Sequence, residues 1–189
     1  MGKKRFFLYT FFTLIAGGAI LMILLNHLDE PVVPNQPWHR SIPVKGTPSA
    51  KSDIFVYFAD QTSTYLVAEQ RSVHYAPDPT ELGRNIINTL LKGPQKDLAP
   101  TIPDGTVLRA FYVDRNRTAY VDLSSAVQKN HPGGSRSELM TIYSVVNSLV
   151  LNMPSIERVK ILIDGREAET LAGHIDLSLP FKADMLIIR

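Results

Sequence analysis

The feature that most constrains this chain of 189 residues is an uncharged run near its N-terminus. The run covers residues 6–25 and is interrupted only by mildly polar side chains such as Tyr9 and Thr10. About 20 helical residues are enough to cross a hydrocarbon core of roughly 30 Å. A buried core helix is a poorer interpretation, because this run is apolar on every face. The run therefore predicts one transmembrane helix, 6–25, within an N-terminal region of residues 1–30.

The charges beside this run predict its orientation. Basic residues precede it at positions 3–5, and acidic residues follow it at positions 29 and 30. The positive-inside bias then places the N-terminus in the cytoplasm and the rest of the chain outside. The alternative is a cleaved signal peptide, which would normally end in a small-x-small site. Residues 24–28 contain no such site, so we expect an uncleaved single-pass anchor.

Residues 31–52 are predicted to form an extended linker between the anchor and a folded domain. Five of the 13 prolines lie in this segment. Proline lacks a backbone N–H group and fixes its own φ angle, so this spacing favours a semi-rigid chain without regular hydrogen bonding. Residues 53–189 then show the alternating patterns of a globular domain.

Charge and composition exclude several classes of function. Residues 53–189 contain 14 Lys and Arg against 16 Asp and Glu, although the whole chain has a net charge of +2. A nucleic-acid-binding domain would carry a basic patch on its own folded surface, so we expect no nucleic-acid partner. The chain has no cysteine. It can therefore have no disulfide, thiolate metal site, cysteine nucleophile or lipid-modified cysteine.

Two helices are indicated by their spacing and end signals. The first should cover about 79–91, with Asp78 as its N-cap and Gly93-Pro94 ending it. The second should begin at Ser135 and continue to about residue 153. A capping box between Ser135 and Glu138 is expected at its start.

Strand patterns surround these helices. They lie at 54–58, 65–73, 106–114, 117–123 and 159–163, with weaker candidates at 175–179 and 185–188. Hairpins between helices favour a mostly antiparallel sheet with both helices packed on one face. The predicted fold class is therefore α+β, a two-layer sandwich.

Known catalytic signatures do not occur in the sequence. There is no Gly-x-Ser-x-Gly elbow, phosphate-binding Walker loop, dinucleotide fingerprint or His-Glu-x-x-His pair. A metal site would require His131, His174 and Asp176 to converge from distant loops. An acid–base pair could come from Asp122 and Asp176, although a solvated or turn-capping role fits both better. We predict no catalytic residue, no metal and no cofactor.

Three other features invite a structural interpretation. The loop at 131–135 resembles a phosphate-binding loop because two glycines precede a helix N-terminus, but no lysine follows, and a flexible start to the helix fits better. Arg71, within an apolar strand, could pair with Glu69 or a helix carboxylate, or stay exposed. Asn147 is the polar position in the apolar stripe of the second helix that we expect to bond across to a loop.

Seven short motifs follow one another along the predicted domain. They are residues 66–71, 90–94, 102–106, 119–124, 142–149, 159–165 and 173–176. Together they resemble the GerMN domain, a family named from spore-germination and sporulation proteins. The candidate structural or interaction positions within or beside these motifs are Arg71, Gly93, Pro94, Gly105, Asp122, Asn147, Gly165, His174 and Asp176.

The resemblance implies a non-enzymatic, extracytoplasmic module of the bacterial envelope. Family members are similar in being tied to the membrane, often as lipoproteins, and in acting in envelope assembly or signalling. This chain departs by having a transmembrane helix in place of the lipoprotein cysteine, and one domain copy in place of two. We therefore expect an inner-membrane protein that binds another envelope protein or itself. The alternatives are an envelope carbohydrate-binding or hydrolytic domain using Asp122, Asp176 and His174, and a small-molecule sensor.

Overall fold

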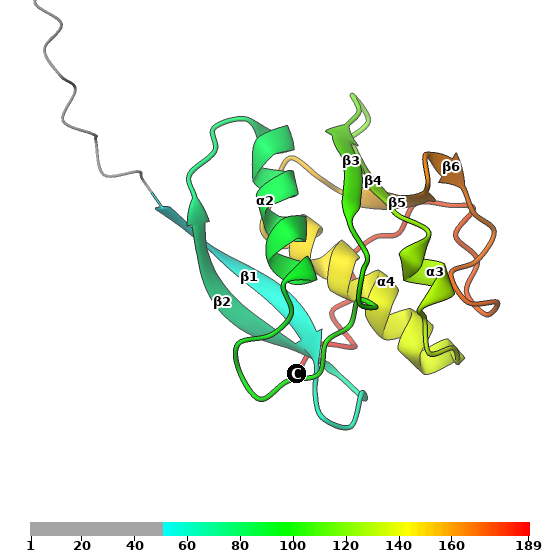
Figure 1. The fold of residues 1–189 in the computed structure, drawn as a ribbon. Coiled ribbons are helices and arrows are strands. Elements are labelled where there is room, and N and C mark those ends of the chain that lie inside the picture. The colour runs from blue at the N-terminus through cyan, green and yellow to red at the C-terminus, as the bar shows by residue number, and fades with distance from the viewer. Residues whose placement is uncertain (1–50) are drawn as a thin grey trace, which may run out of the picture. The chain divides into compact units, whose positions relative to one another are not determined.

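The computed structural model describes residues 51–189 (Figure 1). The predicted transmembrane helix 6–25 lies outside the described residues, as does the linker 31–52 except for its last two residues. Both remain predictions. Between residues 51 and 189, no helix has the length and apolar character that crossing a membrane requires.

The described part opens with a long β-hairpin. Strand β1 (Lys51–Ala59) pairs antiparallel with β2 (Leu66–His74). This confirms the predicted hairpin and lengthens its first strand. Asp60 organises the turn, because its Oδ1 atom accepts the backbone N–H of Thr64 at 2.6 Å and that of Tyr65 at 3.2 Å.

A second sheet contains four strands in the order β3-β4-β5-β6. Its members are β3 (Leu108–Val113), β4 (Thr118–Leu123), β5 (Arg158–Ile163) and β6 (Arg166–Glu167). Strands β4 and β5 are parallel, and the other neighbours are antiparallel. Parallel strands need a long crossover, which the helical segment between β4 and β5 supplies here. The predicted α+β sandwich is confirmed, with a sheet that is not purely antiparallel.

Three helices complete the described part: α2 (Pro79–Leu91), the short α3 (Ala126–Lys129) and α4 (Ser135–Val150). Asp78 caps α2 as predicted, accepting the N–H of Thr80 at 3.0 Å. Both α2 and α4 contact the hairpin and the four-stranded sheet. Figure 1 accordingly shows them lying between these two sheets.

The predicted capping box of α4 is wrong. The N-cap is Gly134, and there is no side-chain capping hydrogen bond from this position. Glu138 does not bend back to the helix terminus, because its carboxylate is engaged by a distant loop. The helix also ends at Val150, three residues before the expected end.

One hydrophobic core joins the hairpin, the helices and the four-stranded sheet. Helix α2 approaches β3 closely at Gly83, because a Cβ atom at this position would lie 2.1 Å from Cζ of Phe111. Phe111 is itself buried. The packing of α2 on the sheet therefore requires glycine at position 83.

The segment after β6, residues 168–189, is called the C-terminal segment below. It does not form the strands predicted at 175–179 and 185–188. It makes only isolated bridges, such as those joining Val159 to Phe181 and Leu66 to Ile188. Buried side chains from α4 and β5 bind its backbone groups instead of a continuous strand ladder. The segment is thus irregular in backbone conformation but extensively hydrogen-bonded.

Candidate functional site

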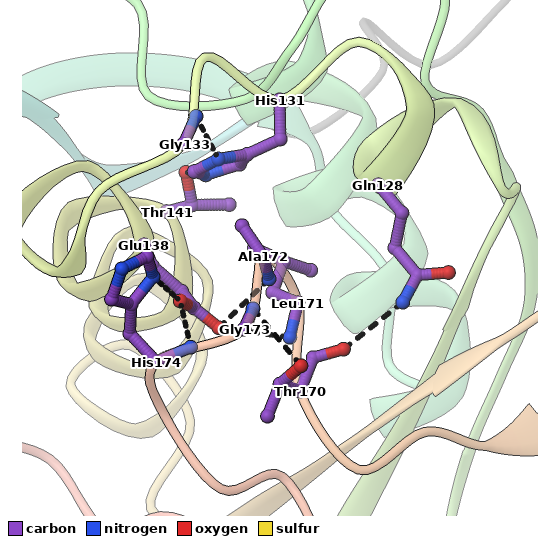
Figure 2. Close-up of polar contacts among 10 residues, drawn as sticks. All are labelled: Gln128, His131, Gly133, Glu138, Thr141, Thr170, Leu171, Ala172, Gly173 and His174. Atoms are coloured by element: carbon purple, nitrogen blue, oxygen red, sulfur yellow. Dashed lines mark hydrogen bonds and ion pairs between the residues drawn. The ribbon is translucent and has the colours of Figure 1, made fainter.

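The candidate site is built around Glu138, in the first turns of α4. Its side chain has no exposed surface. One carboxylate oxygen accepts the backbone N–H groups of Leu171 and Ala172, each at 2.9 Å, and the other accepts that of His174 at 3.0 Å (Figure 2). A single carboxylate thus binds three backbone N–H groups of residues 169–177, which we call loop 169–177.

The surroundings of Glu138 favour its ionised form. Burial by itself would raise the pKa of this carboxyl, but the backbone N–H groups of the loop outweigh burial and hold the pKa below its usual value. The positive end of the α4 dipole acts in the same direction. The ring Nδ1 of His174 lies 3.3 Å from the carboxylate, and the His174 side chain is 46% exposed. Glu138 is therefore a buried anion stabilised mainly by backbone donors.

Loop 169–177 is also held from its other sides. Gln128 in α3 donates its side-chain amide to the carbonyl of Thr170 at 3.0 Å. The loop closes where the N–H of Leu177 donates to the carbonyl of Glu169 at 2.8 Å. Lys160 of β5, itself buried, donates its ammonium to the carbonyls of Leu177 at 3.0 Å and Ser178 at 2.5 Å. Lys160 thus binds backbone carbonyls, and Glu138 binds backbone N–H groups, in the same part of the chain.

His131 lies beside this cluster and is held as a neutral ring. Its Nδ1 accepts the N–H of Gly133 at 3.0 Å, and its Nε2 lies 3.3 Å from the hydroxyl of Thr141 (Figure 2). That hydroxyl donates its proton to the carbonyl of Thr101 at 2.5 Å, so Nε2–H must be the donor toward Thr141. Burial lowers the pKa of His131, in agreement with this arrangement. The glycine-rich 131–135 loop is therefore fastened by a histidine.

A second buried carboxylate, Glu69 of β2, organises the loop after α2. It accepts the N–H of Gln95 at 3.1 Å and that of Lys96 at 2.9 Å, and it pairs with the guanidinium of Arg71. Burial would raise the pKa of Glu69, but the backbone donors and the arginine hold it below its usual value. Arg71 also donates to the carbonyl of Gly93 at 2.9 Å. Of the predicted alternatives for Arg71, pairing with Glu69 is confirmed.

Comparison with known families identifies this architecture. Residues 55–169 match the Germane family, described as sporulation and spore germination. The chain belongs to the Germane family. The match supports the predicted GerMN-type domain and includes both buried carboxylates.

Solved structures show the same fold around this Germane domain. A candidate lipoprotein from Clostridium perfringens is 26% identical, with a TM-score of 0.50, over 70% of this chain and 88% of that one. The first GerMN domain of the Bacillus subtilis sporulation protein GerM is 19% identical, with a TM-score of 0.58, over 69% of this chain and 97% of that one. The tandem GerMN domains of GerM are 18% identical, with a TM-score of 0.55, over 70% of this chain and 46% of theirs. The comparison with curated proteins gives no match.

The Germane domain does not assemble the acid–base pair that was considered from sequence, and the turn-capping alternative describes both aspartates better. Asp122 is buried, accepts the N–H of Gly165 at 2.7 Å and lies 3.4 Å from Nε of Arg109. Asp176 instead accepts the N–H and the hydroxyl of Ser178, at 2.7 and 2.8 Å. Each carboxylate therefore organises its own turn.

The metal site considered from sequence is also not formed. Within residues 51–189 no group of three His, Asp or Glu side chains could hold a metal ion. His174 faces Glu138, His131 faces Thr141, and Asp176 caps its own turn. The arrangement is suited to fixing backbone segments, with each polar group matched to a protein partner.

The glycines singled out from sequence occupy the turns of this Germane domain. Gly93, Gly105 and Gly165 have φ angles of +77°, +78° and +76°, a region that favours glycine. Pro94 directly follows Gly93, in the loop that Glu69 binds.

Asn147 makes the cross-link expected of it. Its side-chain amide donates to the carbonyl of Asp184 at 2.9 Å and accepts the N–H of Asp184 at 3.0 Å. The amide therefore satisfies both backbone groups of one residue in the C-terminal segment. The predicted bond between this helix position and a loop is confirmed.

Sequence reasoning missed the roles of Glu138 and Lys160. Glu138 was interpreted as part of a capping box, a local motif that competes with any long-range role. Lys160 lies within the apolar strand 159–163, where no local pattern gives it a role. A single charged residue in such a run is a usable signal, because an unpaired buried ammonium is costly and must find acceptors.

Proposed function

We propose that this protein is a non-enzymatic interaction module of the bacterial envelope, anchored in the inner membrane by residues 6–25. In this proposal the Germane domain lies outside the cytoplasm and binds another envelope protein or a second copy of the chain. The N-terminal sequence pattern supports the anchor and its orientation. Membership of a sporulation and germination family, and the likeness to a candidate lipoprotein, support the extracytoplasmic setting.

The observation that carries the proposal is the contrast within the C-terminal segment. Glu138, Asn147 and Lys160 bind its backbone from the interior of the domain. The same segment exposes large apolar side chains, of which Leu186 is 88% exposed and Leu179 is 73% exposed. Loops held by a rigid scaffold are the usual carriers of binding function. A fixed backbone that displays apolar side chains is suited to docking a protein without a large ordering cost.

Site-specific photocrosslinking of the full chain in cells tests the interaction. A photoreactive side chain at Leu186 should crosslink to one defined envelope protein or to a second copy. The matched control places the same group at Tyr75, an exposed aromatic residue between β2 and α2. Adducts that are equal at both positions, or absent from Leu186, would contradict the proposed surface.

A point substitution sharpens the test. Leu186→Asp should abolish the specific adduct and leave the free energy of unfolding nearly unchanged, because this side chain is exposed. A complex that survives the charge at position 186 counts against this surface.

The orientation has its own test. Protease added to intact spheroplasts should remove the domain from the membrane fraction. A domain that is cleaved only after lysis would place it in the cytoplasm and overturn the envelope assignment.

A further inference from the structure

A polar cleft lies between the end of β2 and one face of α2, away from the Glu138 site. Its volume is about 470 Å³. The residues that line it are Lys51, Ser72, Val73, His74, Asn85, Asn88, Thr89 and Lys92. Spacings of three and four residues along α2 place Asn85, Asn88 and Lys92 on one helical face.

The lining has the chemistry of an anion site. It contains two lysines and two asparagines and no carboxylate, although acidic residues outnumber basic ones in residues 53–189. Within the described part of the chain, the ammonium groups of Lys51 and Lys92 and the amide of Asn88 have no hydrogen-bond or ion-pair partner. The acidic residue of β1 is Asp53. Its carboxylate accepts hydrogen bonds from the side chains of Ser72 and Gln70, at 2.7 and 3.1 Å. Free donors therefore converge on the cleft without an internal counter-charge.

The cleft is placed where the chain leads toward its predicted anchor. Lys51 lines it and is also the first residue of β1, at the end of the linker predicted from sequence. A proline-rich chain of about 20 residues spans at most roughly 60 Å. A domain on such a linker stays close to the bilayer, so the effective concentration of lipid headgroups around it is high and weak binding is sufficient.

We propose that this cleft binds the phosphodiester headgroup of an anionic phospholipid. The two ammonium groups recognise the phosphate charge, and the amides of Asn85 and Asn88 donate to its oxygens or to the polar end of the headgroup. Binding would turn the β1–α2 end of the domain toward the membrane and leave the C-terminal segment available to a partner. The inference rests on the proposed extracytoplasmic, membrane-anchored state.

The test uses the full chain in an uncharged detergent, titrated with short-chain phosphatidylglycerol and followed by backbone NMR. The expected result is a saturable shift of the amide signals of residues 72–74 and 85–92. Phosphatidylcholine of the same chain length should cause no such shift, because its headgroup has no net charge. Inorganic phosphate should shift the same signals with weaker affinity.

Paired charge variants decide whether the cleft is responsible. The double substitution Lys51→Gln and Lys92→Gln should weaken phosphatidylglycerol binding about 25-fold, since each lysine near an anionic surface contributes about fivefold. The matched control, Lys96→Gln and Lys129→Gln, removes the same charge from two exposed positions outside the cleft and should bind as the original chain does.

Three results would overturn the inference. They are no saturable shift, equal weakening by both pairs of substitutions, and inorganic phosphate binding as tightly as the lipid, which would make the ligand a soluble phosphate. The measurement in detergent depends on neither a partner nor the orientation in a cell. Its failure is therefore distinguishable from failure of the crosslinking and protease tests.

Discussion

Two buried glutamates of this domain, Glu69 and Glu138, perform the same task with different partners. Each is at most 1% exposed, and each accepts backbone N–H groups from an irregular loop. Glu69 also pairs with the buried guanidinium of Arg71. Glu138 pairs instead with the half-exposed ring of His174, and its charge is balanced mainly by backbone dipoles.

This difference indicates that the two loops depend to unequal degrees on the carboxylates that bind them. Glu69 and Arg71 are buried groups of opposite charge. Loss of either one therefore leaves the other buried without its partner. At Glu138, the loop itself is the counter-charge, and water can replace the carboxylate once the loop moves. We therefore expect substitution of Glu69, which we call the hairpin site, to be more destabilising than substitution of Glu138, which we call the α4 site.

Glu69→Ala should have the largest effect. Removing one partner of a buried ion pair typically costs 3–5 kcal/mol, and here it also deprives the N–H groups of Gln95 and Lys96 of their acceptor. Denaturant unfolding of the full chain measures the loss. The control is the double variant Glu69→Ala with Arg71→Met, which should be less destabilised than Glu69→Ala alone. A loss of unfolding free energy below about 1 kcal/mol for the single variant would contradict an essential role of the Glu69–Arg71 pair.

Glu138→Ala should be the next most damaging change. It leaves the N–H groups of Leu171, Ala172 and His174 without an acceptor, and we expect a loss of about 2–3 kcal/mol because the exposed loop can rehydrate. Hydrogen exchange should accelerate at these three amides much more than in β1. Uniform acceleration across the domain would show that loop 169–177 is as integral to folding as the hairpin site.

The two sites should also differ in their response to mild acid. The pKa of His131, beside Glu138, is lowered by burial, so the native state resists a proton that the unfolded chain accepts below about pH 6.5. Stability from this neutral ring is present above that pH and is lost as the pH falls through the folded-state pKa. His131→Gln should remove this pH dependence from unfolding curves between about pH 5 and 7.

Both glutamates lose their contribution to stability in a separate, more acidic range. Their folded-state pKa values are lowered, so their stabilisation is complete above the unfolded pKa of about 4.3 and is lost as the pH falls further.

The His131 prediction would be contradicted if the dependence of stability on pH near neutral persisted in His131→Gln, because the effect would then belong to another group.

The contrast between the two sites also marks what could be predicted from sequence. Features set by neighbouring residues were predicted well, including the Asp78 cap and the end of α2 at Gly93-Pro94, where Gly93 has a positive φ angle. The pairing of Arg71 with Glu69 is one of the alternatives predicted from sequence, and the two residues lie two positions apart on one strand. These are short-range relations, and residue spacing reveals them.

Long-range relations were predicted less well. Glu138 fitted a local capping box, yet its partners lie more than 30 positions away. The strand predicted at 175–179 does not form, because Lys160 binds the carbonyls of Leu177 and Ser178 that a strand ladder would have used. The need for glycine at position 83 depends on how closely α2 approaches Phe111, which no local pattern encodes. Asn147 was the exception, because an amide in an apolar stripe already implies a distant partner.

The smallest expected effect provides the finest test of the comparison. His174→Ala removes the ring beside Glu138 but keeps the backbone N–H of residue 174, which donates to the carboxylate at 3.0 Å. The ring is half exposed, so its contact with the carboxylate should contribute less than about 1 kcal/mol, and any charged part of this contact should weaken with added salt. Unfolding measured at low and high salt checks both statements, with Arg71→Ala as the counterpart at the other carboxylate. If His174→Ala were as costly as Glu138→Ala, the imidazole would be an essential counter-charge, and the two sites would be held by the same principle after all.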